Sequence, residues 1–215
     1  MSEKYPRTKH LPFSPGISKD DTVIKTVEPF INKHIIITEK IDGSNVCMEN
    51  ENCFARSHSS SPKHHSFDAF KAFHAGLKHS IPKHCQYFGE WVYAKHSIAY
   101  DTLPEYFLLF GIRQKRNSNT YWWSWHDIIS TGMITVPVLF DGQVNSGSGL
   151  EQLVIELAGQ GSVFGQEREG VVIRLAHEFD DERFDVSIAK YVRKNHIQTE
   201  DHWLYKPLEK NRLAK

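Results

Sequence analysis

The chain has 215 residues, 40% of them hydrophobic and 24% charged, which is ordinary for a soluble globular protein and enough to bury a substantial core. The 26 Lys and Arg residues balance 26 Asp and Glu residues, so net charge neither favours nor excludes a polyanionic partner. Three cysteines without a Cys-x-x-Cys pair argue against a disulfide framework, 13 histidines show no spacing of a closed zinc site, and no apolar run suits a signal peptide or membrane span. A cytoplasmic protein is therefore expected.

The order of predicted elements indicates an α+β protein. Residues 1–33 are expected to form an extended lead-in, because 6–21 are rich in proline, serine and aspartate. Short apolar runs bounded by turn residues predict strands at 34–38, 45–49, 53–57, 86–94, 106–113, 120–125, 134–140, 169–175 and 185–192. Apolar residues at three-to-four spacing, or a capping serine, predict helices at 66–79 (starting at Ser66), 125–131 and 149–161. Many strands with few helices favour antiparallel sheets with flanking helices in a single domain.

One lysine lies at an unusual place in these strands. The stretch ITEKIDGSN, residues 37–45, places Lys40 at the inner end of an apolar strand, just before a turn at Asp42 and Gly43. A lysine sheltered by apolar neighbours loses some of its preference for the charged form, so its amine can act as a nucleophile near neutral pH. The alternative for this stretch alone is an ordinary hairpin whose lysine points into water.

Other charged residues also lie within or beside apolar strands. Arg56 follows the first hairpin, and Glu90, Glu169 and Lys190 lie in or at the ends of later apolar runs. A charge in an apolar strand is costly to bury unless it is paired or used. Chemistry on a nucleotide phosphate needs a nucleophile, cations, a metal-binding carboxylate and an aromatic surface such as Phe110. The repetition favours one shared site over several unrelated solvent-facing residues.

These residues occur in a known order. The KIDG stretch at 40–43 resembles the KxDG signature of the covalent nucleotidyltransferases, the superfamily of ATP-dependent RNA and DNA ligases and mRNA capping enzymes. The later segments fall in that superfamily's motif order: Arg56, YFGEW around Glu90, FLLFGI through Phe110, EGVVI from Glu169 and AKYV around Lys190. Asn45 resembles the asparagine of RNA ligases, since DNA ligases and capping enzymes usually carry arginine two residues after the glycine.

The resemblance implies a nucleotidyltransferase core, similar to the ATP-grasp-like adenylation core of ligases, with a nucleotide pocket between antiparallel sheets. It implies an ATP-dependent RNA ligase that uses ATP and Mg²⁺ or Mn²⁺ and joins RNA ends bearing a 3′-hydroxyl and a 5′-phosphate. The Lys40 amine would attack the α-phosphate of ATP and retain AMP. The AMP would then pass to the RNA 5′-phosphate, and the 3′-hydroxyl would attack the activated end.

The resemblance also implies a role for each candidate residue. Lys40 is the expected nucleophile, with a pKa lowered by neighbouring Lys190 and by a bound metal. Glu169 is the expected metal-binding carboxylate, and Asp42 is expected at the metal or its waters. The remaining roles concern nucleotide and RNA end: Glu90 at the ribose hydroxyls, Phe110 stacked on adenine, Lys190 at the α-phosphate, Asn45 and Arg56 at phosphate or the RNA end, and Glu39 orienting the base.

Two departures and the chain end qualify the resemblance. Gly111 stands where an acid often follows the aromatic residue, and Val192 stands where the fifth motif usually has a second lysine, so Arg193 or Lys194 remain candidates for that cation. The residues after the fifth motif, expected as a basic tail at 193–215, are too few for an oligonucleotide-binding (OB) domain. RNA-end recognition is therefore expected from the core, the tail or a partner protein.

Two other functions stay open from the sequence. A non-catalytic protein that binds nucleic-acid ends could keep the fold, and the two departures support it. A nick-sealing DNA ligase is the other alternative, and matched DNA and RNA nicks would separate it from an RNA ligase.

Overall fold

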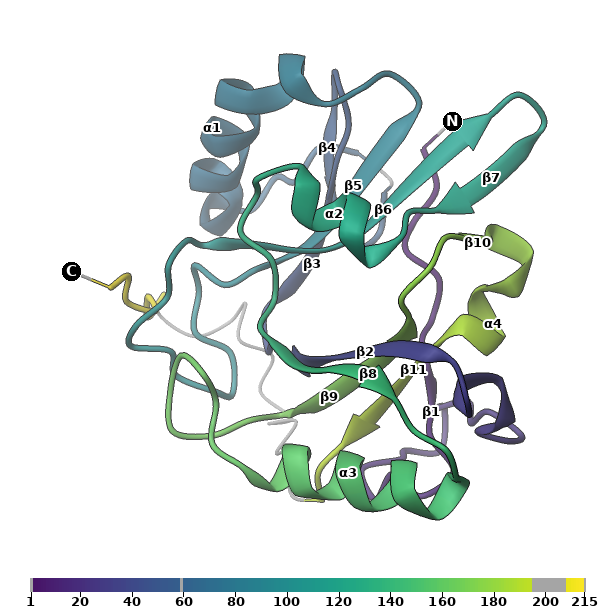
Figure 1. Cartoon of the computed structure of the whole chain (residues 1–215). Coiled ribbons are helices and arrows are strands. Elements are labelled where there is room, and N and C mark those ends of the chain that lie inside the picture. Colours follow the sequence, from purple (N-terminus) through teal and green to yellow (C-terminus); the bar gives the residue numbers. More distant parts are fainter. Residues whose placement is uncertain (1, 59, 195–207, 215) are drawn as a thin grey trace.

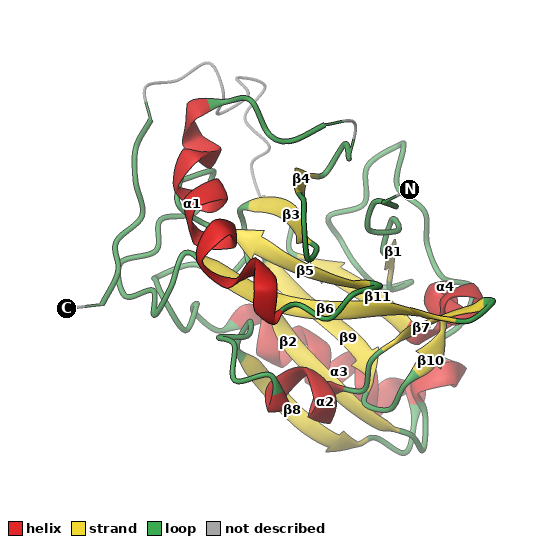
Figure 2. Cartoon of the chain, turned by 90° about the horizontal axis from the view of Figure 1, so that it is seen from above, coloured by secondary structure: helices red, strands yellow, loops and turns green. Residues whose placement is uncertain are grey.

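The structure is a computed structural model that describes residues 2–58, 60–194 and 208–214. Across these residues the strands form two sheets, one above the other in Figure 1, and the two longest helices lie on their outer sides. Viewed from above, the strands of the two sheets cross rather than run side by side (Figure 2). The α+β prediction with antiparallel sheets and flanking helices is confirmed.

The lower sheet in Figure 1 has the strand order β1-β11-β9-β2-β8. Its pairs are antiparallel except for β1 and β11, which are parallel. The strands are β1 (Lys9–His10), β2 (His34–Lys40), β8 (Val138–Gln143), β9 (Gly170–Leu175) and β11 (Ile188–Val192). The long helix α3 (Gly147–Gly159), whose N-cap is Ser146, packs its apolar face on β9 and β11.

The upper sheet is antiparallel throughout and has the order β10-β7-β6-β5-β3-β4. Its strands are β3 (Ser44–Met48), β4 (Cys53–Ala55), β5 (Cys85–Trp91), β6 (Phe107–Arg116), β7 (Asn119–Trp122) and β10 (Phe179–Asp180). Helix α1 (Asp68–Leu77) buries Phe70 against Trp91 and Phe107 of this sheet. The shorter helices are α2 (Trp125–Ser130) and α4 (Phe184–Ser187), with 3-10 turns at Glu28–Phe30, His65–Phe67, Lys78–Ser80 and Asp181–Arg183.

Several predicted strands differ from the structure. Strands β4, β5 and β7 end at Ala55, Trp91 and Trp122, before their predicted ends. Residues 134–137 precede β8 and make only an isolated bridge, because Thr135 pairs with Leu109 of the other sheet. Residues 185–187 belong to α4, so only 188–192 of that predicted strand is extended. The predicted helix start at Ser66 is also wrong: Ser66 lies inside a 3-10 turn, and α1 begins at Asp68. Ser124 caps α2 as predicted, by accepting from the Asp127 amide.

The N-terminal segment is part of the core. Its Tyr5 ring meets the rings of Phe88, Phe110 and Trp122 edge-on at 5.0 to 5.3 Å between centroids. Leu11 is fully buried, and its amide donates to the carbonyl of Lys190 in β11. The segment expected as a lead-in runs between the two sheets and contacts both (Figure 1), and it includes turns and the 3-10 helix at Glu28–Phe30.

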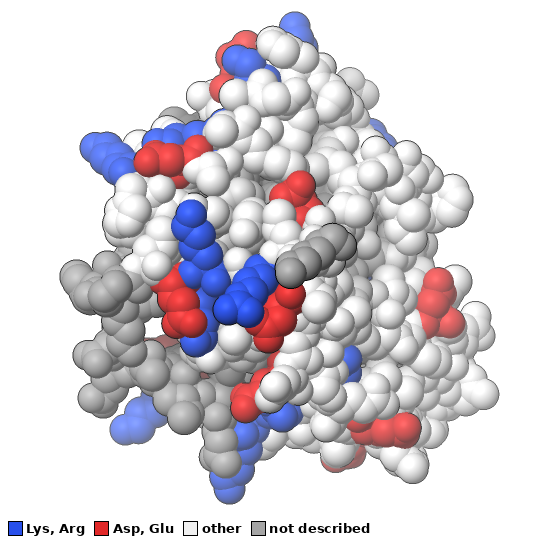
Figure 3. Space-filling view, turned by 90° about the vertical axis from the view of Figure 1, so that its left-hand side faces the viewer, with Lys and Arg blue, Asp and Glu red and all other residues white. Residues whose placement is uncertain are grey.

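The described part of the C-terminal segment, 208–214, is anchored rather than free. Asn211 is buried, accepts from the Tyr100 amide and donates to the Val92 carbonyl. Lys210 lies 4.8 Å from the Tyr93 ring. Residues 195–207 of the predicted basic tail lie outside the described residues. On the face in Figure 3, Lys and Arg side chains lie beside Asp and Glu, so the described residues there form no patch of one sign. Within the described parts of the chain, no helix has the length and apolar character needed to cross a membrane.

Candidate active site

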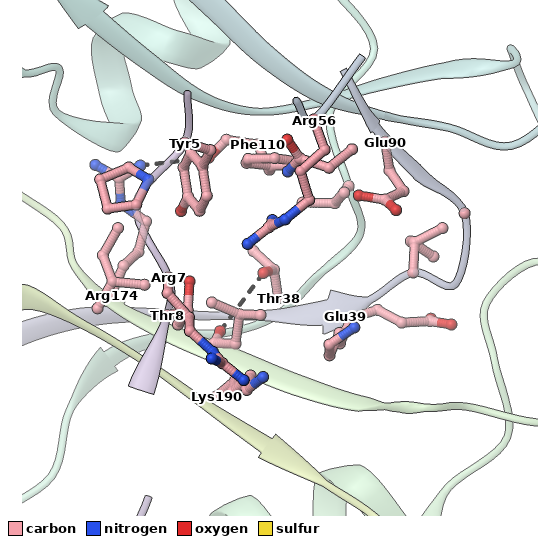
Figure 4. A pocket seen from close by; sticks show the side chains of 18 of the residues that line it. Tyr5, Arg7, Thr8, Thr38, Glu39, Arg56, Glu90, Phe110, Arg174 and Lys190 are labelled. Carbon is pink, nitrogen blue, oxygen red and sulfur yellow. Dashed lines mark hydrogen bonds between the residues drawn. The ribbon is translucent and has the colours of Figure 1, made fainter. Parts of the chain in front are cut away.

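A cavity of about 920 Å³ opens between the two sheets, with the N-terminal segment along one side (Figure 4). Strands β2, β9 and β11 form one wall, and β3, β5 and β6 form the other. Seven of the residues predicted for the site line it: Glu39, Lys40, Asn45, Arg56, Glu90, Phe110 and Lys190. Glu169 and Asp42 are not part of the lining. Glu169 contacts Lys40, and Asp42 contacts the loop after β5.

Lys40 ends β2 and forms an ion pair with a buried carboxylate. Its Nζ lies 2.6 Å from Oε2 of Glu169, although the two residues are 129 positions apart. The pairing of β2 with β9 creates this contact, because Lys40 stands opposite Gly170. A Cβ at Gly170 would lie 2.0 Å from the Tyr191 carbonyl oxygen of β11, so only glycine permits this close packing beside Glu169.

The pKa of Lys40 is raised, not lowered as the sequence analysis expected. Burial is the largest influence and by itself lowers the pKa, but the carboxylates of Glu169, Glu90 and Asp42 together outweigh it. The pKa of Lys190 is lowered instead, because the side chain is partly buried and the charge of Lys40 is nearby. Without a ligand, the Lys40 amine is therefore held as an ammonium ion. A nucleophilic role requires that its carboxylate partners be neutralised or drawn away.

The Asp42–Gly43 turn fixes the position of Lys40 from behind. Oδ2 of Asp42 accepts from the amides of Ser97 and Ile98 at 2.8 and 3.0 Å, and the Asp42 amide donates to the Tyr100 hydroxyl. A Cβ at Gly43 would lie 2.9 Å from the Trp91 carbonyl oxygen. The carboxylate of Asp42 thus anchors the loop after β5. Asp42 is not among the residues that line the cavity, and its place at a metal or its waters stays a prediction.

Glu90 and Asn45 are cross-strand partners on β5 and β3. Burial raises the pKa of Glu90 to about 8; the positive charge of Lys40 opposes this rise and the negative charge of Glu169 adds to it. Glu90 is therefore largely protonated near neutral pH and can donate as well as accept a hydrogen bond. Oδ1 of Asn45 is buried without a hydrogen-bond partner among the described residues. Both groups are available to a ligand in the cavity.

The opposite end of the cavity is aromatic. Phe110 and Tyr5 lie together there in Figure 4, and Trp125 completes the lining. Burial lowers the pKa of Arg174 to about 10, and its Nη2 donates to the Trp123 carbonyl at 2.6 Å. This hydrogen bond links β9, which contains Arg174, to the residue that follows β7 of the upper sheet. The departure at Gly111 also has a reason, because a Cβ there would already lie 3.2 Å from the Trp122 ring.

Cations gather near the mouth of the cavity. The Lys190 Nζ lies 3.7 Å from Oδ1 of Asp21, and Nη2 of Arg7 lies 3.2 Å from the same oxygen. Arg56 reaches toward the centre of the cavity from the opposite wall (Figure 4). Arg7 and Asp21 were missed by the sequence analysis. They lie in a segment without strand or helix periodicity, so nothing local indicated that they face the cavity.

Glu39 is almost fully buried beside Lys40. Its Oε2 accepts from the Val163 amide at 2.9 Å and lies 3.5 Å from Nε of Arg168, while Oε1 has no hydrogen-bond partner among the described residues. Its backbone amide donates to the Pro137 carbonyl. Glu39 thus links β2 to the loop before β9, and its place in the cavity wall leaves the predicted contact with a base open.

The second cation expected after Lys190 does not come from the neighbouring residues. Val192 is buried, and neither Arg193 nor Lys194 lines the cavity. Nη2 of Arg193 lies 3.9 Å from a Glu167 oxygen instead. Besides Lys40 and Lys190, the cations that line the cavity are Lys4, Arg7, Arg56 and Arg174.

The carboxylates offer limited capacity for a metal. Within the described ranges, no three His, Cys, Asp or Glu side chains are grouped so that they could hold an ion by themselves. Magnesium, however, is commonly bound by one or two carboxylates together with substrate phosphates and water. Glu169, beside Lys40, fits an ion whose coordination a nucleotide would complete.

The chain belongs to the RNA ligase family, whose model matches residues 33–192, and no curated protein matches it. The fold is shared with solved structures of low sequence identity. A Naegleria gruberi RNA ligase mutant with ATP and Mn has 16% identity and a TM-score of 0.52, over 89% of this chain and 60% of that chain. An archaeal ATP-dependent RNA ligase has 16% identity and a TM-score of 0.57, over 88% and 48%. Naegleria gruberi RNA ligase with PPi has 19% identity and a TM-score of 0.55, over 90% and 61%. This chain therefore spans about half to three fifths of their length.

Proposed function

We propose that this chain is an ATP-dependent RNA ligase that joins a 3′-hydroxyl to a 5′-phosphate through AMP bound to Lys40. The observation that carries the proposal is a lysine amine at the wall of a nucleotide-sized cavity, 2.6 Å from a buried carboxylate and close to further cations. Membership of the RNA ligase family and the ATP-bound relatives support the same reaction. The roles of individual residues remain proposals.

The reaction we propose has three balanced steps. The Lys40 ammonium group loses a proton to water, its nitrogen forms a bond to the α-phosphorus of ATP while the bond to pyrophosphate breaks, and the nitrogen then loses a second proton. An oxygen of the RNA 5′-phosphate next attacks that phosphorus, and the bond to the lysine nitrogen breaks as this nitrogen takes up a proton. The RNA 3′-hydroxyl finally attacks the 5′-phosphorus, loses its proton and expels AMP.

Each wall of the cavity supplies part of this chemistry. We propose that Phe110 stacks on adenine, that Glu90 bonds the ribose hydroxyls and that Lys190 offsets the charge of the α-phosphate. Asn45 and Arg56 lie where they would contact a phosphate or the RNA end, and Glu39 would orient the base. Asp42 supports the turn that presents Lys40, and its place at the metal or its waters stays a prediction.

A divalent ion, Mg²⁺ or Mn²⁺, would be held by Glu169, where it would polarise phosphate oxygens and favour the neutral form of the neighbouring amine. A bound ion would oppose the raised pKa of Lys40, because it would draw the Glu169 carboxylate away from the ammonium ion that this carboxylate stabilises.

We also propose that the described residues form one adenylyltransferase domain that acts in the cytoplasm, where its free buried cysteines Cys47, Cys53 and Cys85 would stay reduced. The RNA ends would be recognised by this domain, by the basic residues 193–215 or by a partner protein.

The test is sealing of a defined substrate panel. Wild-type protein with ATP and Mg²⁺ should label itself from α-labelled ATP and then join a nicked RNA, whereas Lys40→Ala should do neither. Stronger labelling by GTP would contradict the assignment to ATP. Equal or better joining of a matched DNA nick would favour a DNA ligase, and RNA binding without any labelling would favour a non-catalytic end binder.

A further inference from the structure

Two cations from distant parts of the chain meet at the mouth of the cavity. Arg7 comes from the N-terminal segment, and Lys190 comes from β11. The parallel pairing of β1 with β11 brings them together, because His10 stands opposite Lys190 in that pair. Figure 4 shows Arg7 and Lys190 on the same side of the cavity, across from Arg56.

One carboxylate holds both cations in place. Oδ1 of Asp21 lies 3.2 Å from Nη2 of Arg7 and 3.7 Å from Nζ of Lys190, while Oδ2 accepts from the amide and the hydroxyl of Ser18. His10 Nε2 also lies 3.4 Å from Oδ2. The local sum is two fixed positive charges against one carboxylate, so the group keeps an excess positive charge beside the cavity.

Two other cations of the cavity are less free to bind an anion. Lys40 is paired with Glu169 at 2.6 Å, and Arg174 is buried and directed at backbone carbonyls. Arg7, in contrast, keeps 53% of its side-chain exposure and lines the cavity. A planar guanidinium beside an ammonium suits the oxygens of a phosphate group.

We propose that Arg7 and Lys190 together form a phosphate-binding pair, with Arg7 taking the place that Val192 cannot fill in β11. This inference rests on the proposed function, which brings two phosphate sources to the cavity: the outer phosphates of ATP and the 5′-phosphate of RNA. Both present the same chemistry to the pair, so the experiment must separate them.

Direct binding by the whole chain tests the pair without any reaction. Calorimetric titration would use inorganic pyrophosphate as one probe, and a short RNA with a 5′-phosphate against the same RNA with a 5′-hydroxyl as the other. The variants are Arg7→Ala, the charge-conserving Arg7→Lys, and Lys19→Ala. Lys19 is an exposed cation of the same segment that does not line the cavity, so it is a matched control for lost charge.

Arg7→Ala should weaken pyrophosphate binding about tenfold or more, Arg7→Lys should recover part of it, and Lys19→Ala should bind like the wild type. If only the advantage of the 5′-phosphorylated RNA is lost, the pair binds the RNA end. If Arg7→Ala changes neither affinity, or if the wild type binds neither phosphate, the inference is wrong. Binding does not need the Lys40 amine, so a protein that binds pyrophosphate through Arg7 without becoming labelled would contradict the proposed function alone.

Discussion

The two walls of the cavity differ in how their charges are balanced. On the β2–β9–β11 wall the charged groups are paired: Lys40 with Glu169, and Lys190 with Asp21. The β3–β5–β6 wall instead offers a phenyl ring, a carboxyl group whose pKa is raised to about 8, and an arginine that reaches into the cavity. The comparison suggests a division of work, in which the paired wall carries the bond-making chemistry and the other wall recognises the nucleotide.

Glu169→Gln tests the paired wall and has the largest expected effect. The amide keeps the size of the side chain but loses the charge that faces Lys40 and would hold the metal, so the rate of self-labelling at saturating ATP should fall about 100- to 1000-fold. The rate is measured from α-labelled ATP over time. Glu167→Gln removes an exposed carboxylate two residues away and is the control. If the labelling rate of Glu169→Gln falls by less than about threefold, this carboxylate does not take part in the reaction.

Phe110→Ala tests the recognition wall. Loss of a base-stacking ring costs about 1–3 kcal/mol, so the KM for ATP should rise about 10- to 100-fold while the maximal labelling rate changes much less. Phe110→Tyr keeps the ring and should stay close to the wild type. A variant that loses maximal rate at unchanged KM would show that this wall takes part in the chemistry and would break the comparison.

The pH dependence of stability tests the raised pKa of Glu90 on the recognition wall. Glu90 has a folded pKa of about 8 against an ordinary 4.5, so the folded protein binds a proton more tightly than the unfolded chain. Stability should therefore fall as pH rises from about 4.5 to 8 and then level off, whereas Glu90→Gln lacks this loss. Urea unfolding at pH 5 and pH 8.5 should show the variant gaining about 1–3 kcal/mol on the wild type over that interval. Parallel pH profiles would contradict the burial of this carboxyl.

Asn211→Ala has the smallest expected effect and concerns the loop behind Asp42. The substitution leaves the Tyr100 amide and the Val92 carbonyl without their side-chain partner, which should cost about 1–3 kcal/mol of unfolding free energy. Thermal unfolding would measure it, with the exposed Asn145→Ala as control. The KM for ATP should stay unchanged, and a large rise would mean that the C-terminal segment acts on the recognition wall directly.

The sequence predicted the strands that carry the site because their signal is local. The apolar runs before Lys40 and around Glu90 identify β2 and β5 from a few positions each. Two-residue strands such as β1 and β10 leave no such signal. The resemblance to the nucleotidyltransferase motifs identified candidate residues on both walls, and seven of those residues line one cavity.

The partners of these residues could not be predicted in the same way. The contact of Lys40 with Glu169 joins positions 129 apart and follows from the pairing of β2 with β9. A lowered pKa for Lys40 was expected from the charges of Lys190 and a bound metal, whereas the fold places carboxylates around the amine that raise this pKa when no metal is bound. Arg7 was missed for a related reason, since a segment without periodicity does not reveal what it packs against.

The central claim is that the Lys40 amine becomes bonded to AMP. Parallel reactions with α- and γ-labelled ATP test it most directly. They are quenched with EDTA at neutral pH, because acid hydrolyses a phosphoramide bond, and are followed by proteolysis and mass spectrometry. The proposed reaction predicts label from α-labelled ATP only, on the peptide that contains Lys40. AMP on another residue, or label retained from the γ-phosphate, would contradict it.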